Sequence, residues 1–149
     1  MYALKSVLKG KLIPLGKVND PVFSQEILGK GVAVIPEEGK IFSPAKGEIV
    51  MICETMHAFT MITYFGAELL IHIGIDTVRM NGEGFTFYVK AGDKVEEGQL
   101  LAKVNLRKMV RAGYDMVTPM VICNSSSYKI QPVFQKEYVK PGDIVLELE

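Results

Sequence analysis

The sequence has no tryptophan and only two cysteines and two histidines among its 149 residues. It also lacks an excess of charge of either sign, because 17 basic residues balance 17 acidic ones. Nucleic-acid-binding proteins normally carry a basic excess, so this balance argues against that class. No apolar run reaches the roughly 20 residues of a membrane-spanning helix, and residues 1–16 contain no apolar signal-peptide core. We therefore expect a cytoplasmic protein that does not itself cross the membrane.

The two cysteines, Cys53 and Cys123, each lie in a short apolar segment. Two such residues are too few for a disulfide framework, and their neighbours indicate buried thiols in a reducing compartment. The chain has the usual size of one domain, and no linker or low-complexity segment divides it. The sequence therefore predicts a single domain over residues 1–149.

Glycine and proline interrupt the chain at short intervals, and the runs between them are rich in Val, Ile, Phe and Tyr. Many short strands separated by turn residues are typical of an all-β sandwich or barrel. Strands are expected at residues 31–35, 48–53, 58–64, 68–75, 85–89 and 144–148. The best helix candidate is residues 104–112, which Asn105 could cap and Gly113 could end. The predicted fold class is all-β, an antiparallel sandwich or barrel with at most one or two short helices.

A weak internal repeat relates two segments of the chain. Residues 88–95 read Tyr-Val-Lys-Ala-Gly-Asp-Lys-Val, and residues 138–145 read Tyr-Val-Lys-Pro-Gly-Asp-Ile-Val. Residues 42–50 are a third, looser copy. We interpret each copy as a hairpin with a turn between its strands, rather than as a solenoid unit, because the period is not sustained.

Because the chain has only two histidines, the candidates for catalysis are few. His72 lies in a segment typical of a buried strand that runs into a turn, and His57 lies at the start of the strand before it. Gly66 is the expected left-handed residue of the turn between these strands. If that turn is centred between residues 64 and 65, the two histidines pair directly, with Cβ atoms about 5 Å apart. A glycine bulge would shift the register by one residue and turn one ring to the opposite face.

Two apposed imidazole rings suit phosphoryl transfer without a metal. A neutral ring nitrogen is a nucleophile, and an ordinary histidine pKa of about 6.5 leaves the ring mostly neutral at cytoplasmic pH. The second ring could donate a hydrogen bond to the phosphoryl oxygens. Thr55 is expected on the same face as His57 and could orient its ring, and Asp76 could help to orient the ring of His72.

The residues around the histidines also have plainer interpretations. We expect Leu70 and Phe59 on the histidine face, where apolar side chains would keep water from a phosphohistidine. A single histidine in an apolar strand, however, is more often a core residue. Asp76 is at least as easily explained as a turn residue, and Thr55 as a residue that favours strands.

Longer motifs give the chain a specific resemblance. It closely resembles the IIA domain of the glucose family of the bacterial phosphoenolpyruvate-dependent sugar phosphotransferase system. The strings that carry the resemblance are Leu-Leu-Ile-His-Ile-Gly-Ile-Asp-Thr-Val at 69–78 and Glu-Thr-Met-His-Ala at 54–58. Other matching segments follow in order from about Lys11 to the C-terminus, at residues 20–24, 29–36, 43–48, 81–85 and 89–95.

The resemblance implies a β-sandwich with Greek-key features and a shallow apolar active-site depression. It implies that His72 is the phosphorylated residue and that His57 assists the transfer. Thr55 would hydrogen-bond the assisting ring, and Asp76 would flank the site.

The resemblance also implies partners. The phosphoryl donor would be the phosphocarrier protein HPr. The acceptor would be a cysteine of a IIB domain, which phosphorylates sugar as the membrane IIC domain transports it. The chain would then be a phosphotransferase component with a phosphohistidine intermediate and without a cofactor or metal. It would meet the membrane only through IIC.

Two other classes match parts of the sequence. A zinc metallopeptidase of the lysostaphin-like type also presents histidines from a β hairpin, and a site could be drawn from His57, His72 and Asp76. Catalytic zinc generally needs three protein ligands, and the usual His-x-His pair of that class is absent. A biotinyl or lipoyl carrier would match the Val-Lys-x-Gly-Asp-x-Val segments, but no lysine stands in a Met-Lys-Met-like turn.

Overall fold

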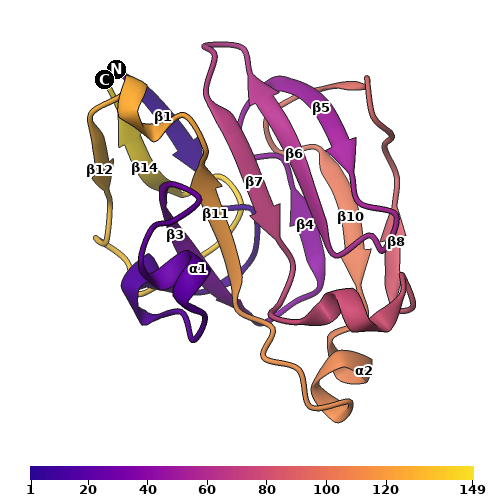
Figure 1. Ribbon diagram of the computed structural model, residues 1–149. Helices are drawn as coiled ribbons and strands as arrows, with labels where there is room; N and C mark the ends of the chain where they lie inside the picture. The colour runs from indigo at the N-terminus through magenta and orange to yellow at the C-terminus, as the bar shows by residue number, and fades with distance from the viewer.

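A computed structural model describes all residues, 1–149, and strands form most of its ordered elements (Figure 1). An eight-stranded sheet has the order β13-β2-β3-β11-β7-β6-β5-β9, and two three-stranded sheets have the orders β1-β14-β12 and β4-β10-β8. The strands are β1 (Tyr2–Lys5), β2 (Gly10–Pro14), β3 (Lys30–Pro36), β4 (Lys40–Phe42), β5 (Gly47–Ile52), β6 (Ala58–Thr63), β7 (Glu68–His72), β8 (Phe85–Phe87), β9 (Lys94–Val95), β10 (Leu100–Val104), β11 (Thr118–Ile122), β12 (Ile130–Pro132), β13 (Tyr138–Val139) and β14 (Ile144–Leu148).

Every strand pair in these sheets is antiparallel. The large sheet packs against the two small ones around a cluster of 28 buried apolar residues. On β6 and β7, alternate residues face this core, among them Phe59, Met61, Leu69 and Ile71. The predicted all-β sandwich is confirmed.

A smaller apolar cluster lies on the other face of the large sheet. There the segment with the 3-10 helix η1 (Leu15–Lys17) and the helix α1 (Pro21–Ser24) covers β3 and β11. Phe23 of α1 is buried in this cluster together with Ala33 and Val121. One part of the outer sheet face is therefore covered by a short strap, and the strap ends beside β7.

The sequence repeat marks corners rather than hairpins. In each copy the strands on either side of the turn belong to different sheets, since β4 and β5, β8 and β9, and β13 and β14 do not pair. The Gly-Asp turn is the same in two copies: the backbone N–H of Lys90 donates to the Asp93 carboxylate (2.9 Å), and that of Lys140 donates to Asp143 (3.0 Å). Local sequence specifies such a turn, but the choice of partner strand depends on residues far away in the chain.

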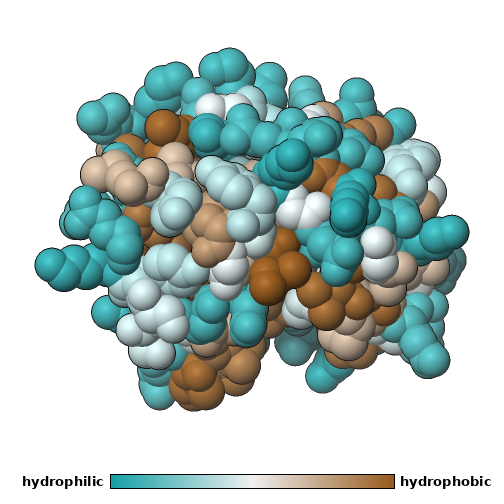
Figure 2. All heavy atoms as spheres, turned by 90° about the horizontal axis from the view of Figure 1, so that it is seen from above, coloured by the Kyte–Doolittle hydropathy of each residue, from teal (hydrophilic) through white to brown (hydrophobic).

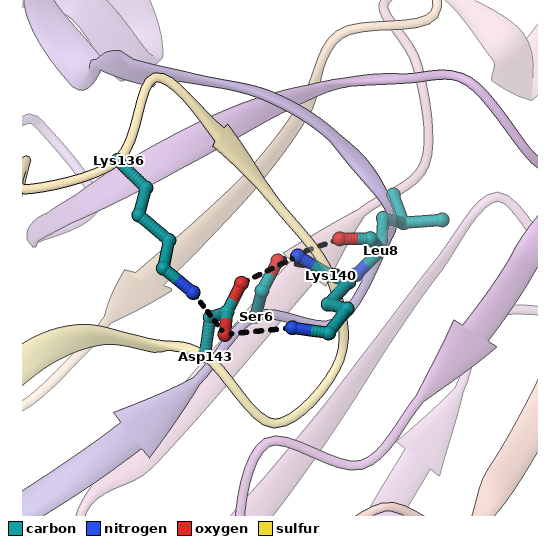
Figure 3. A network of polar contacts seen from close by, with 5 residues as sticks. All are labelled: Ser6, Leu8, Lys136, Lys140 and Asp143. Carbon is teal, nitrogen blue, oxygen red and sulfur yellow. Dashed lines mark hydrogen bonds and ion pairs between the residues drawn. The ribbon is translucent and has the colours of Figure 1, made fainter.

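Asp143 shows how tightly one of these corners is held (Figure 3). Its carboxylate accepts hydrogen bonds from the Nζ of Lys136 (3.1 Å) and of Lys140 (3.3 Å). Beside it, the buried hydroxyl of Ser6 donates to the carbonyl of Leu8 (2.7 Å). The Ser6 N–H donates to the backbone carbonyl of Asp143 (2.8 Å), and this bond connects the last corner of the chain to the segment between its first two strands.

Two helices have caps that the sequence encodes. The prediction at residues 104–112 is confirmed by α2 (Leu106–Arg111), where the Asn105 side chain accepts from the Lys108 N–H (3.1 Å). The helix α1 was not predicted, although Asp20 accepts from the Val22 N–H (3.0 Å) just before Pro21 at the helix start. The remaining 3-10 helices are η2 (Thr77–Met80) and η3 (Ser125–Ser127).

The prediction that both cysteines are buried is wrong. Cys123 is exposed and Cys53 is half-buried, and neither is in a disulfide. Each stands immediately after a strand, where the chain leaves the sheet, so apolar neighbours on one side do not place the thiol in the core.

The end of the molecule that carries both termini has a mixed surface (Figure 2). Hydrophilic side chains cover most of it, and hydrophobic residues show between them as separate patches. None of the helices has the length and apolar character to cross a membrane.

Candidate functional site

His57 is held by a short loop between β5 and β6. The Cys53 N–H donates to the carbonyl of Ala58 (3.0 Å), and the Met56 N–H donates to the carbonyl of Cys53 (2.8 Å). These two bonds close the loop, and the carbonyl of His57 accepts from the Ile73 N–H (2.7 Å). The backbone of His57 is thereby tied to the strand that carries His72.

The sequence left two registers open between the strands of the histidines, and the structure has the one that is shifted by one residue from the direct pairing. In the β6–β7 ladder, Ala58 and not His57 lies opposite His72. The reason is the turn: the Thr63 N–H bonds to the carbonyl of Ala67 (2.9 Å), which leaves a loop of three residues, with Gly66 at φ 92 as the predicted left-handed residue.

This shift does not separate the rings. His57 precedes β6, so the alternation of side chains between the two sheet faces does not fix the direction of its ring. Its ring lies against that of His72 with centroids 5.0 Å apart and an interplanar angle of 78°. The convergence expected from the sequence is therefore found, through a loop and not through a strand pair.

A backbone carbonyl fixes the tautomer of His72. Its Nδ1 lies 2.5 Å from the carbonyl oxygen of Gly74. A carbonyl oxygen can only accept, so Nδ1 carries the proton. In the neutral ring this leaves Nε2 with a lone pair, and Nε2 is the atom that can act as a nucleophile.

The ring of His57 is held by a side chain. Its Nδ1 lies 2.6 Å from Oγ1 of Thr55. A threonine hydroxyl can donate as well as accept. When the hydroxyl donates to Nδ1, the neutral ring carries its proton on Nε2. The Nε2–H can then donate a hydrogen bond to an oxygen placed between the two histidines.

Both rings favour the neutral form. Burial lowers the pKa of His57, and the nearby ring of His72 lowers it further. Burial also lowers the pKa of His72, although the Gly74 carbonyl and the carboxylates of Asp20 and Asp76 act in the opposite direction. Desolvation is the largest cause for each ring, so both are mostly neutral at pH 7.

The apolar surroundings of His72 differ from those predicted. Phe59 is fully buried and packs on Phe87 at 5.6 Å on the core side of β6, so its predicted place beside the histidines is wrong. It lies opposite Ile71 in the ladder, and both point away from the face of His72. The aromatic neighbour of His72 is instead Phe23 of α1, with ring centroids 5.2 Å apart.

Leu70, by contrast, is half-buried, two residues before His72 on the same side of β7. Asp76 follows the turn after β7, exposed and with φ 61. It carries a charge near His72, but the ring donates its hydrogen bond to the carbonyl of Gly74.

Sequence reasoning missed three contributors to the site: Asp20, Phe23 and the Gly74 carbonyl. An Asp-Pro pair is a recognised signal for a helix start and could have revealed α1. No side-chain pattern reports a backbone carbonyl.

The structure gathers no group of three or more His, Cys, Asp or Glu side chains that could hold a metal ion. The two ring nitrogens Nδ1 are already engaged by Gly74 and Thr55. The zinc alternative would need a third protein ligand in addition to the two remaining nitrogens.

Comparisons with known proteins give a consistent result. The model of a protein family described as phosphoenolpyruvate-dependent sugar phosphotransferase system, EIIA 1, matches residues 2–128. A beta-glucoside-specific EIIBCA component of Bacillus subtilis (strain 168) is 41% identical over 145 residues, which is 97% of this chain and 24% of that protein. A glucose-specific EIIA component of Halalkalibacterium halodurans is 43% identical over 130 residues, 87% of this chain and 73% of that protein.

The fold is also similar to a solved structure. Glucose permease IIA from Mycoplasma capricolum superposes with a TM-score of 0.90 at 31% identity, covering 97% of this chain and 94% of that one. The chain spans only about a quarter of the length of the multi-component EIIBCA relatives.

Proposed function

This chain belongs to the EIIA 1 family of the phosphoenolpyruvate-dependent sugar phosphotransferase system, and on that premise we propose that it carries a phosphoryl group on His72 from phospho-HPr to the cysteine of a IIB domain. The observation that supports this most strongly is the pair of converging rings, 5.0 Å apart at their centroids.

In the first transfer, Nε2 of His72 attacks phosphorus, and the bond from phosphorus to the donor breaks as the new P–N bond forms. The hydrogen bond from Nδ1 to Gly74 supports this step, because it leaves the lone pair on Nε2. The pKa of His72, lowered by burial, keeps the nucleophile unprotonated at pH 7. No oxidant, reductant or water takes part.

In the second transfer, the sulfur of the IIB cysteine attacks the same phosphorus, and the P–N bond breaks with its electron pair returning to Nε2. His57 has its Nδ1 held by Thr55 and can donate from Nε2 to a phosphoryl oxygen. Such a hydrogen bond stabilises the charge that shifts among the oxygens during transfer. We assign Thr55 the orientation of His57, and Asp76 a place at the edge of the site.

The choice of sugar is made elsewhere in the system. The relatives are named for beta-glucosides, glucosamine and glucose, although each contains a segment 41–43% identical to this chain. We infer that selectivity resides in the IIB and IIC parts.

The direct test is labelling with phosphoenolpyruvate, enzyme I and HPr. The protein should take up one phosphoryl group per chain, and the bond should be labile in acid and stable in base. His72→Gln should abolish labelling. His57→Gln should still be labelled but should pass the group to IIB at least tenfold more slowly, in keeping with the effect of a positioned hydrogen-bond donor. Labelling of the His72→Gln protein, checked as folded by circular dichroism, would refute the assignment.

A further inference from the structure

The carbonyl that orients His72 belongs to an unusual backbone position. Gly74 has φ +78, which strongly favours glycine. A Cβ at this position would lie 2.7 Å from Cγ2 of Thr77 and 2.8 Å from the sulfur of Met116. The turn that presents the carbonyl is therefore enclosed by other side chains and has little room to move.

Thr77 is the polar side chain in that enclosure. It is 0% exposed, in the first turn of η2. Its hydroxyl donates to the carbonyl of Ile73 at 2.6 Å, back across Gly74 to the end of β7. A buried hydroxyl is unfavourable unless it is hydrogen-bonded, so this bond favours one arrangement of the turn.

The opposite side of the same turn is held by the backbone. The Ile75 N–H donates to the carbonyl of Asp115 (2.8 Å), and Ile73 donates to the carbonyl of His57 (2.7 Å). Residues 73 and 75 are thus fixed on either side of Gly74. The hydroxyl of Thr77 is the side-chain contact that completes this frame.

We propose that Thr77 is a positioning residue for His72: its hydroxyl holds the turn so that the Gly74 carbonyl accepts from Nδ1 and leaves Nε2 free. The consequence for transfer rests on the proposed function, but the consequence for the tautomer does not. The two can therefore fail separately.

The experiment compares Thr77→Val, which keeps the shape and removes the hydroxyl, with Thr77→Ser, which keeps the hydroxyl. Thr63→Val is the matched control. Thr63 is also buried, at 4% exposure, and its Oγ1 accepts from the Ala67 N–H (3.0 Å) at the far end of the same two strands. The readouts are the tautomer of His72 by ¹⁵N NMR in the unphosphorylated protein and the rate of labelling by phospho-HPr.

In Thr77→Val we expect the ratio of the Nδ1–H to the Nε2–H form of His72 to fall about threefold to tenfold, the factor that the loss of one hydrogen bond produces. Labelling should slow in proportion to the fall in the fraction of molecules that have the Nδ1–H form. Thr77→Ser and Thr63→Val should keep the tautomer and rate of the original protein.

A folded Thr77→Val protein with an unchanged tautomer would overturn the proposal. If Thr77→Val does not fold, Thr77→Ser still decides: the proposal is wrong if this variant loses the Nδ1–H form although its hydroxyl is present. Failure of the unaltered protein to be labelled, with His72 still in the Nδ1–H form, would instead refute the proposed function.

Discussion

At the scale of single residues, the two nearby imidazoles of the site favour the uncharged form. With centroids 5.0 Å apart, two charged rings would repel by about 3 kcal/mol at an effective dielectric constant of about 20. Burial, like this repulsion, favours the uncharged rings, and it lowers the pKa of both histidines. The carboxylates of Asp20 and Asp76 limit the fall of the His72 pKa without reversing it, so the ring stays neutral.

This electrostatic description predicts the titration of both rings. Followed by NMR, His57 and His72 should each take up a proton only below pH 6.5. In His72→Gln the pKa of His57 should rise, because the repulsion from the other ring is gone, but it should stay below 6.5 because burial remains. A midpoint of either ring above 6.5 in the unaltered protein would contradict the description.

The same shifts affect stability in a defined direction. In the unfolded chain the two histidines have a pKa near 6.5, and in the folded chain the pKa of each is lower. The stabilisation from the neutral rings is therefore complete above pH 6.5 and is lost as pH falls through the folded-state pKa values.

At the scale of elements, α1 connects stability to the site. Asp20 both caps this four-residue helix and lies near enough to raise the pKa of His72. Phe23 of the same helix covers one side of the His72 ring. Substitutions at Asp20 can separate the two effects, because asparagine keeps the cap and removes the charge.

We predict that Asp20→Ala lowers the free energy of unfolding by about 1 kcal/mol through loss of the cap. Asp20→Asn should change it by only a few tenths of that value. Both variants should lower the pKa of His72 further. Urea denaturation and NMR titration measure the two quantities. Equal losses of stability in the two variants would show that the side-chain cap is not the cause.

Particular elements show what the sequence can and cannot predict. The strand that carries His72 was predicted as buried, and its burial does alternate, with Leu69 and Ile71 on the core face, because burial with period two is a local property. The register at His72 stayed open in the sequence, because turns of two and of three residues both fit it, and the structure has the turn of three. Phe59 was placed on the wrong face because its placement assumed the turn of two residues, and a shift by one residue exchanges the faces of a strand.

The corners between the sheets also show that strand pairing depends on residues far away in the sequence. The Gly-Asp turns were read correctly as turns, but the strands around them pair with distant strands in other sheets. Thr55 and the two histidines, which the structure brings together, were predicted from the chemistry of their side chains. The Gly74 carbonyl also contacts His72, but a backbone carbonyl has no side-chain signal in the sequence.

At the scale of the whole molecule, the site lies far from the chain ends. In Figure 1, β7 runs away from the end where both termini lie, and His72 is its last residue. The site is on the outer face of the large sheet, beside the strap that carries α1. A partner can therefore approach it without contact to the small sheet that holds β1 and β14.

This placement predicts where a charge disturbs docking. Val22 is 39% exposed and is the neighbour of Phe23, whereas Ile144 is 43% exposed on β14. Val22→Glu should slow labelling by phospho-HPr at least threefold at low HPr concentration, because a carboxylate would have to lose water in an apolar interface. Ile144→Glu, the matched control, should leave the rate unchanged. Equal rates for both variants would place the docking surface elsewhere.

Because the Gly74 carbonyl accepts from Nδ1 of His72, phosphorus should bind Nε2 of that ring. The most direct measurement is ³¹P and ¹⁵N NMR of the labelled protein, which identifies the nitrogen bonded to phosphorus. We predict a single P–N bond at Nε2 of His72, with Nδ1 still protonated. A phosphoryl group on Nδ1, or on the ring of His57, would contradict the account.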